Sequence, residues 1–335
     1  MRIKLKNKKI KISKKFLFLG ILIFALAILQ FLAISTFFVF SFPRVSAGIG
    51  ENVTVNSQLD IGNVYPEILS ITINDGYSID LTPNSTTLLS VIVIARDFNG
   101  EGDIDNVSLE FFDNSNSLYG GADNNSIHYT NISCDINTSY GDEYEIESNC
   151  TLYLEYYANE GLWNASVLVT DSEGWTTFNS STQSVNELLA IGLPDSINYG
   201  QVNATFVSDE QLANVTNYGN VELNLTLSGY AQTPGDNYAM NCSLGAIGFI
   251  SIFYEKFNLT ESTPGALSFG EFEGTYTNLT KTTEVNVYEF NLNKRTDDVI
   301  NNAIKPSFWR IYVPMGVAGS CTGNIVFGAV RDPAS

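Results

Sequence analysis

Apolar and polar residues alternate with a period of two along most of the chain beyond residue 60. In VELNLTLSG (221–229), aliphatic residues at odd positions alternate with Glu, Asn, Thr and Ser, which predicts one buried and one solvated face. In EVNVYEFNLN (284–293) the apolar set changes from Val285 and Val287 to Phe290 and Leu292, which predicts a β-bulge. Other β-branched and aromatic runs lie at 90–97, 106–113, 150–157, 163–171, 308–314 and 324–330. Many short strands separated by turns indicate an all-β fold of antiparallel β-sandwiches, with no long amphipathic helix.

The amino-terminal region has a different pattern. The first 15 residues carry eight Lys or Arg and no acid, and the 27 residues at 16–42 carry no charge. As a helix, 16–42 would be about 40 Å long, enough to cross a bilayer with tilt. The basic flank stays on the cytoplasmic side, which sends everything after Pro43 outside.

The sequence is compatible both with cleavage after this apolar segment and with its retention as a membrane anchor. Val45, Ser46 and Ala47 offer small side chains to a signal peptidase, which would cut before Gly48. The apolar stretch is longer than the ~7–15 residues of an ordinary signal peptide, which favours an uncleaved anchor. We therefore expect a single-pass membrane protein with its carboxy-terminal part outside, or a secreted protein if cleavage follows Ala47.

The length of the chain predicts its number of domains, and its charge restricts the partners that it can bind. A chain of 335 residues is long enough for two domains after the apolar segment. All 36 acidic residues but only eight of the 17 basic ones follow Ala47, and this negative field excludes nucleic acid and favours cations or basic partners. The predicted segments are a basic cytoplasmic stretch (1–15), a transmembrane helix or signal sequence (16–42), a linker (43–61), an Ig-like β-sandwich (62–187) and a second β-sandwich (188–333).

Four cysteines lie in the part predicted to be exported, where disulfides persist. They permit three pairings. Two fall in each predicted sandwich, which favours Cys134–Cys150 and Cys242–Cys321.

An acidic turn, DFNGEGDID (97–105), is a candidate calcium site. Calcium binds six to eight oxygen ligands, and oxygen side chains occupy every second position here. Gly102 matches the sixth position of an EF-hand loop, but Ser108 stands where the closing Glu belongs. The alternative is a turn that is simply solvated. The predicted ligands are Asp97, Asn99, Asp103 and Asp105; we expect no other cofactor.

The acceptor sequence N-x-S/T occurs 15 times. Several copies follow from Asn and Thr alternating on a solvated strand face. In an exported protein, copies in loops favour N-glycosylation. The candidates are Asn52, Asn84, Asn106, Asn124, Asn131, Asn137, Asn149, Asn164, Asn179, Asn203, Asn214, Asn224, Asn241, Asn258 and Asn278.

Signals for catalysis are weak. GSCTG (319–323) has the spacing of a nucleophile elbow with Cys in the place of Ser, but a strand is expected after it. The only histidine, His128, lies in the other half. Exposed Trp163, Trp175 or Trp309 would favour a sugar-binding role.

Two stretches carry a resemblance to known proteins. WNASVLVTDSEG (163–174) resembles the penultimate strand and closing turn of polycystic-kidney-type and other Ig-like surface domains. TNYGNVELNLTLSG, with FWRIYVPMGVAGSCTGNIVF, resembles the second sandwich of predicted archaeal cell-surface proteins. The likeness spans residues 60–333 and departs from antibody-type domains because Trp163 follows both cysteines of its half. It implies a fold and a cell-surface location, and no activity.

These observations predict a non-enzymatic extracellular surface protein that serves envelope structure or adhesion. The alternative is a carbohydrate-binding, lectin-like module, and a secreted hydrolase comes third. The expected partners are the membrane, through 16–42, and surface proteins or glycans.

Overall fold

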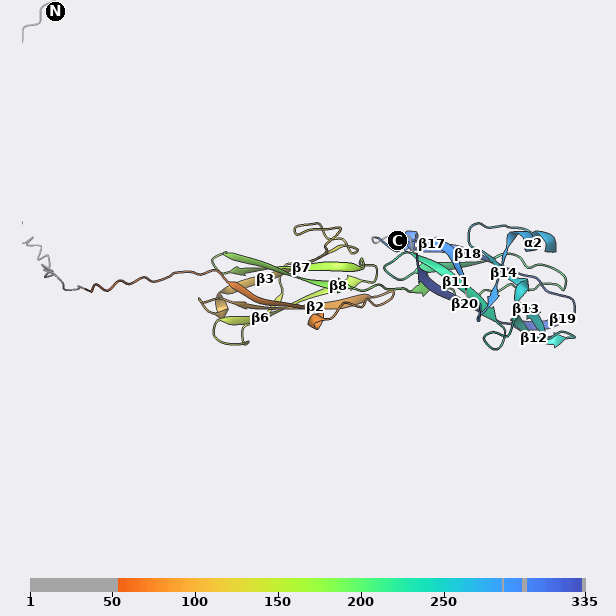
Figure 1. Ribbon diagram of the computed structural model, residues 1–335, viewed down its shortest axis with the longest axis horizontal. Coiled ribbons are helices and arrows are strands. Elements are labelled where there is room, and N and C mark those ends of the chain that lie inside the picture. The colour runs from red at the N-terminus through yellow and green to blue at the C-terminus, as the bar shows by residue number, and fades with distance from the viewer. Residues whose placement is uncertain (1–53, 285, 297–299, 333–335) are drawn as a thin grey trace, which may run out of the picture. The chain divides into compact units, whose positions relative to one another are not determined.

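The computed structural model describes residues 54–284, 286–296 and 300–332. In its first half, two sheets pack face to face (Figure 1). The sheet orders are β1-β2-β6-β5 and β4-β3-β7-β8, and every strand pairing in them is antiparallel. The strands are β1 (Glu67–Ile73), β2 (Thr86–Arg96), β3 (Ile104–Asp113), β4 (His128–Asn131), β5 (Asp135–Asn137), β6 (Glu145–Glu155), β7 (Gly161–Asp171) and β8 (Thr176–Val185). Short 3-10 turns follow β1 (η1, Asn74–Gly76) and precede β3 (η2, Glu101–Asp103).

Period-two alternation produces the core of this sandwich. Along β2, residues 89, 91, 93 and 95 are buried and those between them are half-buried, so one face packs inward. Trp163 and Phe111 lie stacked in the centre with ring centroids 5.0 Å apart. The Cys134–Cys150 disulfide joins the segment before β5 to β6, which is the pairing favoured by the sequence.

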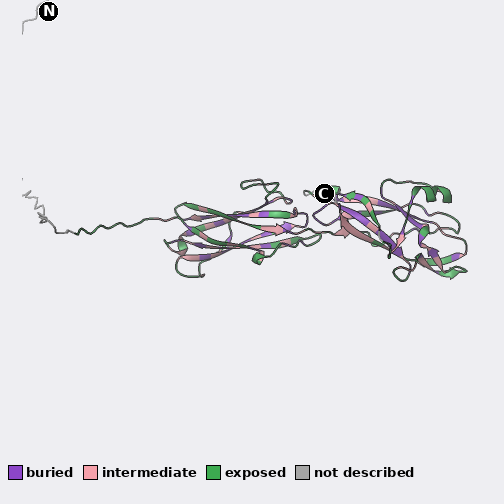
Figure 2. Ribbon diagram, viewed as in Figure 1, coloured by how far each residue is buried: buried purple, intermediate pink, exposed green. Residues whose placement is uncertain are grey.

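The second half has more strands, which form three sheets of different sizes. The sheet orders are β15-β14-β18-β10-β9, β16-β11-β17 with β20 on β11, and β13-β12-β19. The elements are β9 (Ile191–Gly192), β10 (Gln211–Asn217), β11 (Leu223–Tyr230), β12 (Tyr238–Gly245), β13 (Phe249–Ser251), η3 (Ile252–Tyr254), β14 (Glu255–Asn258), α2 (Phe269–Thr275), β15 (Thr277–Asn278), β16 (Thr280–Lys281), β17 (Val287–Leu292), η4 (Ile300–Ala303), β18 (Ile304–Ile311), β19 (Val317–Thr322) and β20 (Asn324–Arg331). Figure 2 shows buried residues between these layers and exposed ones along α2. The Cys242–Cys321 disulfide links β12 to β19.

The predicted solvated face of β11 is only partly solvated, which corrects the sequence analysis. Asn224 is 4% exposed and Ser228 is 5% exposed. The reason lies in the predicted bulge: register shifts where β11 meets β17, and the Asn224 side-chain oxygen accepts hydrogen bonds from the backbone N–H groups of Phe290 and Asn291. Asn224 therefore satisfies donors that the interrupted ladder leaves without strand partners.

A short helix, α2, lies where the sequence analysis predicted only strands and turns. It begins with a capping box in which the Ser268 side chain accepts from the Glu271 N–H and the Glu271 carboxylate accepts from the Ser268 N–H. Its buried Phe272 forms a separate apolar cluster with Tyr276 and Phe308. The helix thus covers one edge of the second sandwich with its own small core.

Some predictions fall outside the described residues: the apolar segment 16–42, the cleavage position before Gly48, the sequon at Asn52 and the inward position of Val285. In the described ranges no helix is long and apolar enough to cross a membrane. Both sandwiches belong to one compact unit, which begins at Ile61.

Candidate functional site

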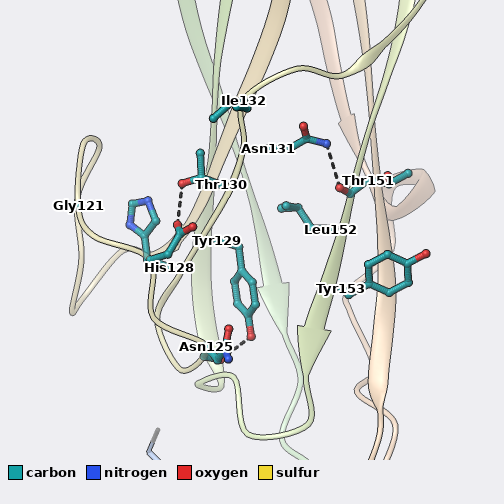
Figure 3. A pocket seen from close by; sticks show the side chains of 11 residues that line it. Gly121, Asn125, His128, Tyr129, Thr130, Asn131, Ile132, Thr151, Leu152 and Tyr153 are labelled. Carbon is teal, nitrogen blue, oxygen red and sulfur yellow. Dashed lines mark hydrogen bonds between the residues drawn. The ribbon is translucent and has the colours of Figure 1, made fainter. Parts of the chain in front are cut away.

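The first sandwich has a pocket of about 780 Å³ between β4 and β6 (Figure 3). It forms because the two sheets have open edges here: β4 pairs with β3 alone, and β5 covers β6 only at residues 147–149. The Asn131 amide bridges the gap by donating to the Thr151 carbonyl at 3.1 Å. The lining consists of Gly121, Asp123, Asn125, His128, Tyr129, Thr130, Asn131, Ile132, Thr151, Leu152 and Tyr153.

The pocket combines one exposed aromatic ring with polar groups. The Tyr153 side chain is 65% exposed and stands on β6, across the pocket from His128 on β4. The Thr130 hydroxyl donates to Asp123 at 2.7 Å, while Tyr129 and Leu152 are buried beneath. An exposed ring beside hydroxyl, amide and carboxylate groups can stack on a sugar and hydrogen-bond its hydroxyls.

The lining of this pocket does not contain the pair of carboxylates that glycoside hydrolysis uses. Asp123 is the one carboxylate in the lining. His128 is fully buried, its Nδ1 lies 2.9 Å from the Ser117 hydroxyl, and its ring stacks on Phe112. Its Nε2 lies 3.4 Å from Glu110 Oε2, so both ring nitrogens face polar side chains.

The other catalytic signal is a structural feature of the second sandwich. Cys321 in GSCTG lies on β19 and forms a disulfide, and strand β20 follows it. A nucleophile elbow requires a strand, a sharp turn and then a helix. The motif therefore lies in β19, apart from Gly323, which connects β19 to β20.

The structure brings together only two of the four residues predicted to bind calcium. Asp97 follows β2 and Asp103 ends η2, and each places a carboxylate oxygen within 4.8 Å of the other and of Asp171, at the end of β7. The Asn99 side chain hydrogen-bonds instead to the backbone of Gly62 and Val64. Asp105 is exposed at the start of β3. Asp171 was missed because it lies far away in sequence, although it belongs to the turn motif VTDSEG.

The described acceptor asparagines differ in accessibility. Asn224 is buried and its oxygen is engaged by the β-bulge, which leaves no room for a glycan in the folded protein. Half-buried positions are Asn106, Asn131, Asn164, Asn241 and Asn258. Exposed positions are Asn84, Asn124, Asn137, Asn149, Asn179, Asn203, Asn214 and Asn278.

Of the three tryptophans, Trp175 alone is exposed, and so meets the condition that favours a sugar-binding role. Trp163 and Trp309 are fully buried, one in each core. Trp175 is 39% exposed, and Tyr65 lies against it with ring centroids 4.5 Å apart.

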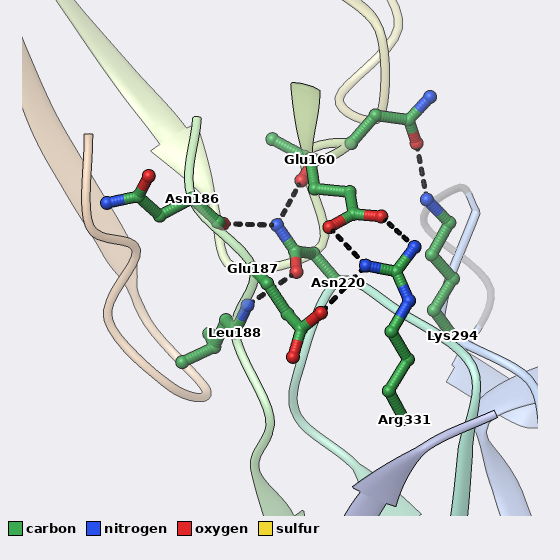
Figure 4. A network of polar contacts seen from close by, with 9 residues as sticks. Glu160, Asn186, Glu187, Leu188, Asn220, Lys294 and Arg331 are labelled. Carbon is green, nitrogen blue, oxygen red and sulfur yellow. Dashed lines mark hydrogen bonds and ion pairs between the residues drawn. The ribbon is translucent and has the colours of Figure 1, made fainter. Parts of the chain in front are cut away.

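The junction between the sandwiches is a dense polar network (Figure 4). Asn220 is fully buried; its amide nitrogen donates to the carbonyls of Ala158 and Asn186, each at 3.0 Å, and its oxygen accepts from the Leu188 N–H at 2.7 Å. All of its hydrogen-bonding groups therefore have partners, and these span both sandwiches and the connection between them.

Charged residues surround this asparagine. Arg331 at the end of β20 pairs with Glu160 of the first sandwich and with Glu187 of the connection. Lys294 donates to the Asn159 side chain at 2.6 Å, and burial lowers the pKa of its amine. The short connection also pairs directly with the second sandwich, since Tyr218 N–H donates to Ala190 O at 2.9 Å.

No protein-family model and no curated protein sequence matches this chain. Among solved structures, it is similar to the C-terminal domain of the Streptococcus agalactiae AgI/II polypeptide BspA, with 11% identity over 80% of this chain and 96% of that one and a TM-score of 0.21. It is also similar to carbohydrate-binding modules of the β-sandwich superfamily, at 11% identity over 80% and 97% of the two chains and a TM-score of 0.23. A chaperone–tip adhesin complex of CFA/I fimbriae gives 11% identity over 76% and 79%, with a TM-score of 0.28. Similarities of this size transfer no function.

Proposed function

We propose that this chain is a non-enzymatic surface protein that displays two Ig-like sandwiches outside the cell, where it serves envelope structure or adhesion. In this proposal residues 16–42 anchor it in the membrane, and 43–61 form the stalk. The observation that carries the proposal is the junction: both sandwiches and the connection between them share the hydrogen bonds of Asn220 and the ion pairs of Arg331.

This junction is better suited to holding two sandwiches at a cell surface than to domain closure over a substrate. Domain closure over a substrate needs a hinge, whose backbone groups are free to change conformation. Here the connection between β8 and β9 is engaged along its length, because Asn186 O, Leu188 N and Ala190 O all have partners on residues 218–220. Two sandwiches held in this way keep a fixed spacing, which a structural or adhesive surface protein requires.

The pocket between β4 and β6 supports a second candidate, recognition of a surface glycan. Its exposed Tyr153 ring and its neighbouring hydroxyl, amide and carboxylate groups match the chemistry of a saccharide. In this alternative the fixed sandwiches present the pocket to a partner surface.

Binding to isolated cell envelopes tests both candidates. The full chain in detergent micelles is incubated with the insoluble envelope fraction, washed with high salt, and the supernatant is assayed for released saccharide. The proposal predicts retention without release. Loss of retention would contradict the surface role, and progressive release of soluble fragments would show an enzyme.

A matched pair of variants separates the two candidates. Tyr153→Ala removes the ring at the pocket, whereas Tyr77→Ala removes a ring that is 75% exposed elsewhere on the first sandwich. If glycan recognition drives retention, Tyr153→Ala lowers it and Tyr77→Ala does not. Equal retention of both variants would assign the binding to another surface.

A further inference from the structure

The carboxylates of Asp97, Asp103 and Asp171 meet at one end of the first sandwich, where β2, η2 and β7 end. One carboxylate oxygen of each lies within 4.8 Å of the others, and Asp97 and Asp171 are 0% and 1% exposed. Three like charges this close repel one another strongly in a partly desolvated place. No ion pair formed by the described residues includes any of the three, so no basic side chain offsets the repulsion.

Two oxygens in this cluster have no partner, although their neighbours on the same carboxylates do. Asp97 Oδ1 accepts from the Asn99 N–H at 2.8 Å and Asp103 Oδ1 accepts from the Ser172 hydroxyl. The second oxygen of each, Oδ2, is buried and makes no hydrogen bond. A buried carboxylate oxygen without a partner is costly, unless a ligand supplies the missing contact.

We propose that Asp97, Asp103 and Asp171 bind one Ca²⁺. All three donors are hard oxygens, and the cluster holds neither the His nor the Cys that is typical of zinc sites. The donors come from one loop and a strand end, and calcium accepts such irregular oxygen sets, whereas magnesium demands a near-octahedral one. Burial, with Asp103 and Asp171 nearby, also raises the pKa of Asp97, as expected for a carboxylate that lacks its counter-charge.

The site also holds the chain where it enters the sandwich. The Asn63 side-chain amide donates to Asp171 Oδ2 at 2.9 Å. Asn99, between two of the ligands, donates to the Gly62 carbonyl and accepts from the Val64 N–H, each at 2.9 Å. Calcium would therefore order the loop that carries Asn99 and, through it, residues 62–64. This assigns Asn99 a positioning role and leaves Asp105 outside the site.

The test measures thermal unfolding of the full chain in detergent, in EDTA and in about 5 mM calcium, which exceeds the dissociation constants of ~10⁻⁴–10⁻³ M typical of extracellular modules. We expect calcium to raise the melting temperature by roughly 3 °C or more. Asp103→Asn keeps the Ser172 hydrogen bond, removes the charge, and should abolish this rise. Asp105→Asn is the matched control, two residues further along at the start of β3, and should respond like the wild type.

Three further readouts distinguish a cation site from a merely structural cluster. Asp97→Asn relieves repulsion, so it should melt above the wild type in EDTA and below it in calcium; a structural role alone predicts lower stability in both. Tb³⁺ should give luminescence sensitised by Trp175, whose backbone N–H donates to Asp171 Oδ1 at 2.7 Å, and calcium should displace it. Proteolysis within residues 61–66 should be faster in EDTA.

Several results would overturn the proposal. These are identical melting of the wild type in EDTA and calcium, or a calcium response in Asp103→Asn equal to that of Asp105→Asn. An equal response to magnesium would reject the preference for calcium. If acidification from pH 7 to pH 5 in EDTA stabilised the wild type while calcium did nothing, a shared proton would occupy the place assigned to the cation.

Discussion

Glu255, the first residue of β14, is a buried carboxyl group whose ionisation should weaken the second sandwich. It is 1% exposed, the Tyr199 hydroxyl donates to its Oε1 at 2.9 Å, and its Oε2 has no hydrogen-bond partner. Desolvation by burial raises the pKa of Glu255 from 4.5 to about 7, against the opposing effect of the Tyr199 hydrogen bond.

The sign and size of the effect follow from linkage. Below pH 4.5 the carboxyl group is protonated in both the folded and the unfolded chain. Between 4.5 and about 7 the unfolded chain releases its proton first, so stability falls as pH rises. One pKa unit corresponds to about 1.4 kcal/mol, and the full rise therefore corresponds to a loss of about 3 kcal/mol at pH 8.

Glu255→Gln should remove this dependence. The amide oxygen can still accept from Tyr199, and no charge has to be buried. At pH 8 the variant should melt roughly 6 to 12 °C above the wild type, and this difference should shrink toward pH 4.5. Thermal unfolding across this pH range measures it, with Glu261→Gln, at an exposed loop position, as the control. A constant difference between Glu255→Gln and the wild type would refute the reasoning.

Three other predictions concern contacts that hold the fold together. Asn220→Ala leaves two carbonyls and one N–H without their partner, so it should cost about 2–4 kcal/mol and separate the unfolding of the two sandwiches; a single unshifted transition in calorimetry would reject the junction's role. Glycopeptide mapping should find glycans at exposed Asn149 and none at Asn224, and a glycan on Asn224 in folded protein would contradict its burial. Replacing Cys242 and Cys321 by Ser opens a loop with a separation of 79 residues and should cost about 4 kcal/mol in chemical denaturation; an unchanged midpoint would contradict this.

The alternation of apolar and polar residues predicted the strands, because successive side chains along a strand point alternately to the core and to solvent. The run at 90–97 corresponds to β2 and that at 163–171 to β7. The same reasoning placed Asn224 on a solvated face, where it is wrong, because a bulge on the neighbouring strand folds backbone donors onto that side chain. The start of helix α2 could have been predicted from the sequence, since Ser268 and Glu271 have the spacing of a capping box.

The candidate sites were less predictable because their residues meet only through the fold. Asp97 and Asp103 lie within one turn, and the oxygen side chains at every second position there predicted both as ligands. Asp171 joins them only after β3 pairs with β7 and brings the strand ends together. The pairing of Glu160 with Arg331 spans 171 residues, and no local motif indicates it.

The central claim is that the two sandwiches stand outside the cell. Intact cells that produce the full chain can be stained with antibodies raised against folded residues 61–332, with an internal protein as the control for cell integrity. The proposal predicts staining of intact cells at the level seen after permeabilisation, while the internal protein stays unstained. Staining that appears only after permeabilisation would place the sandwiches inside and contradict the surface role.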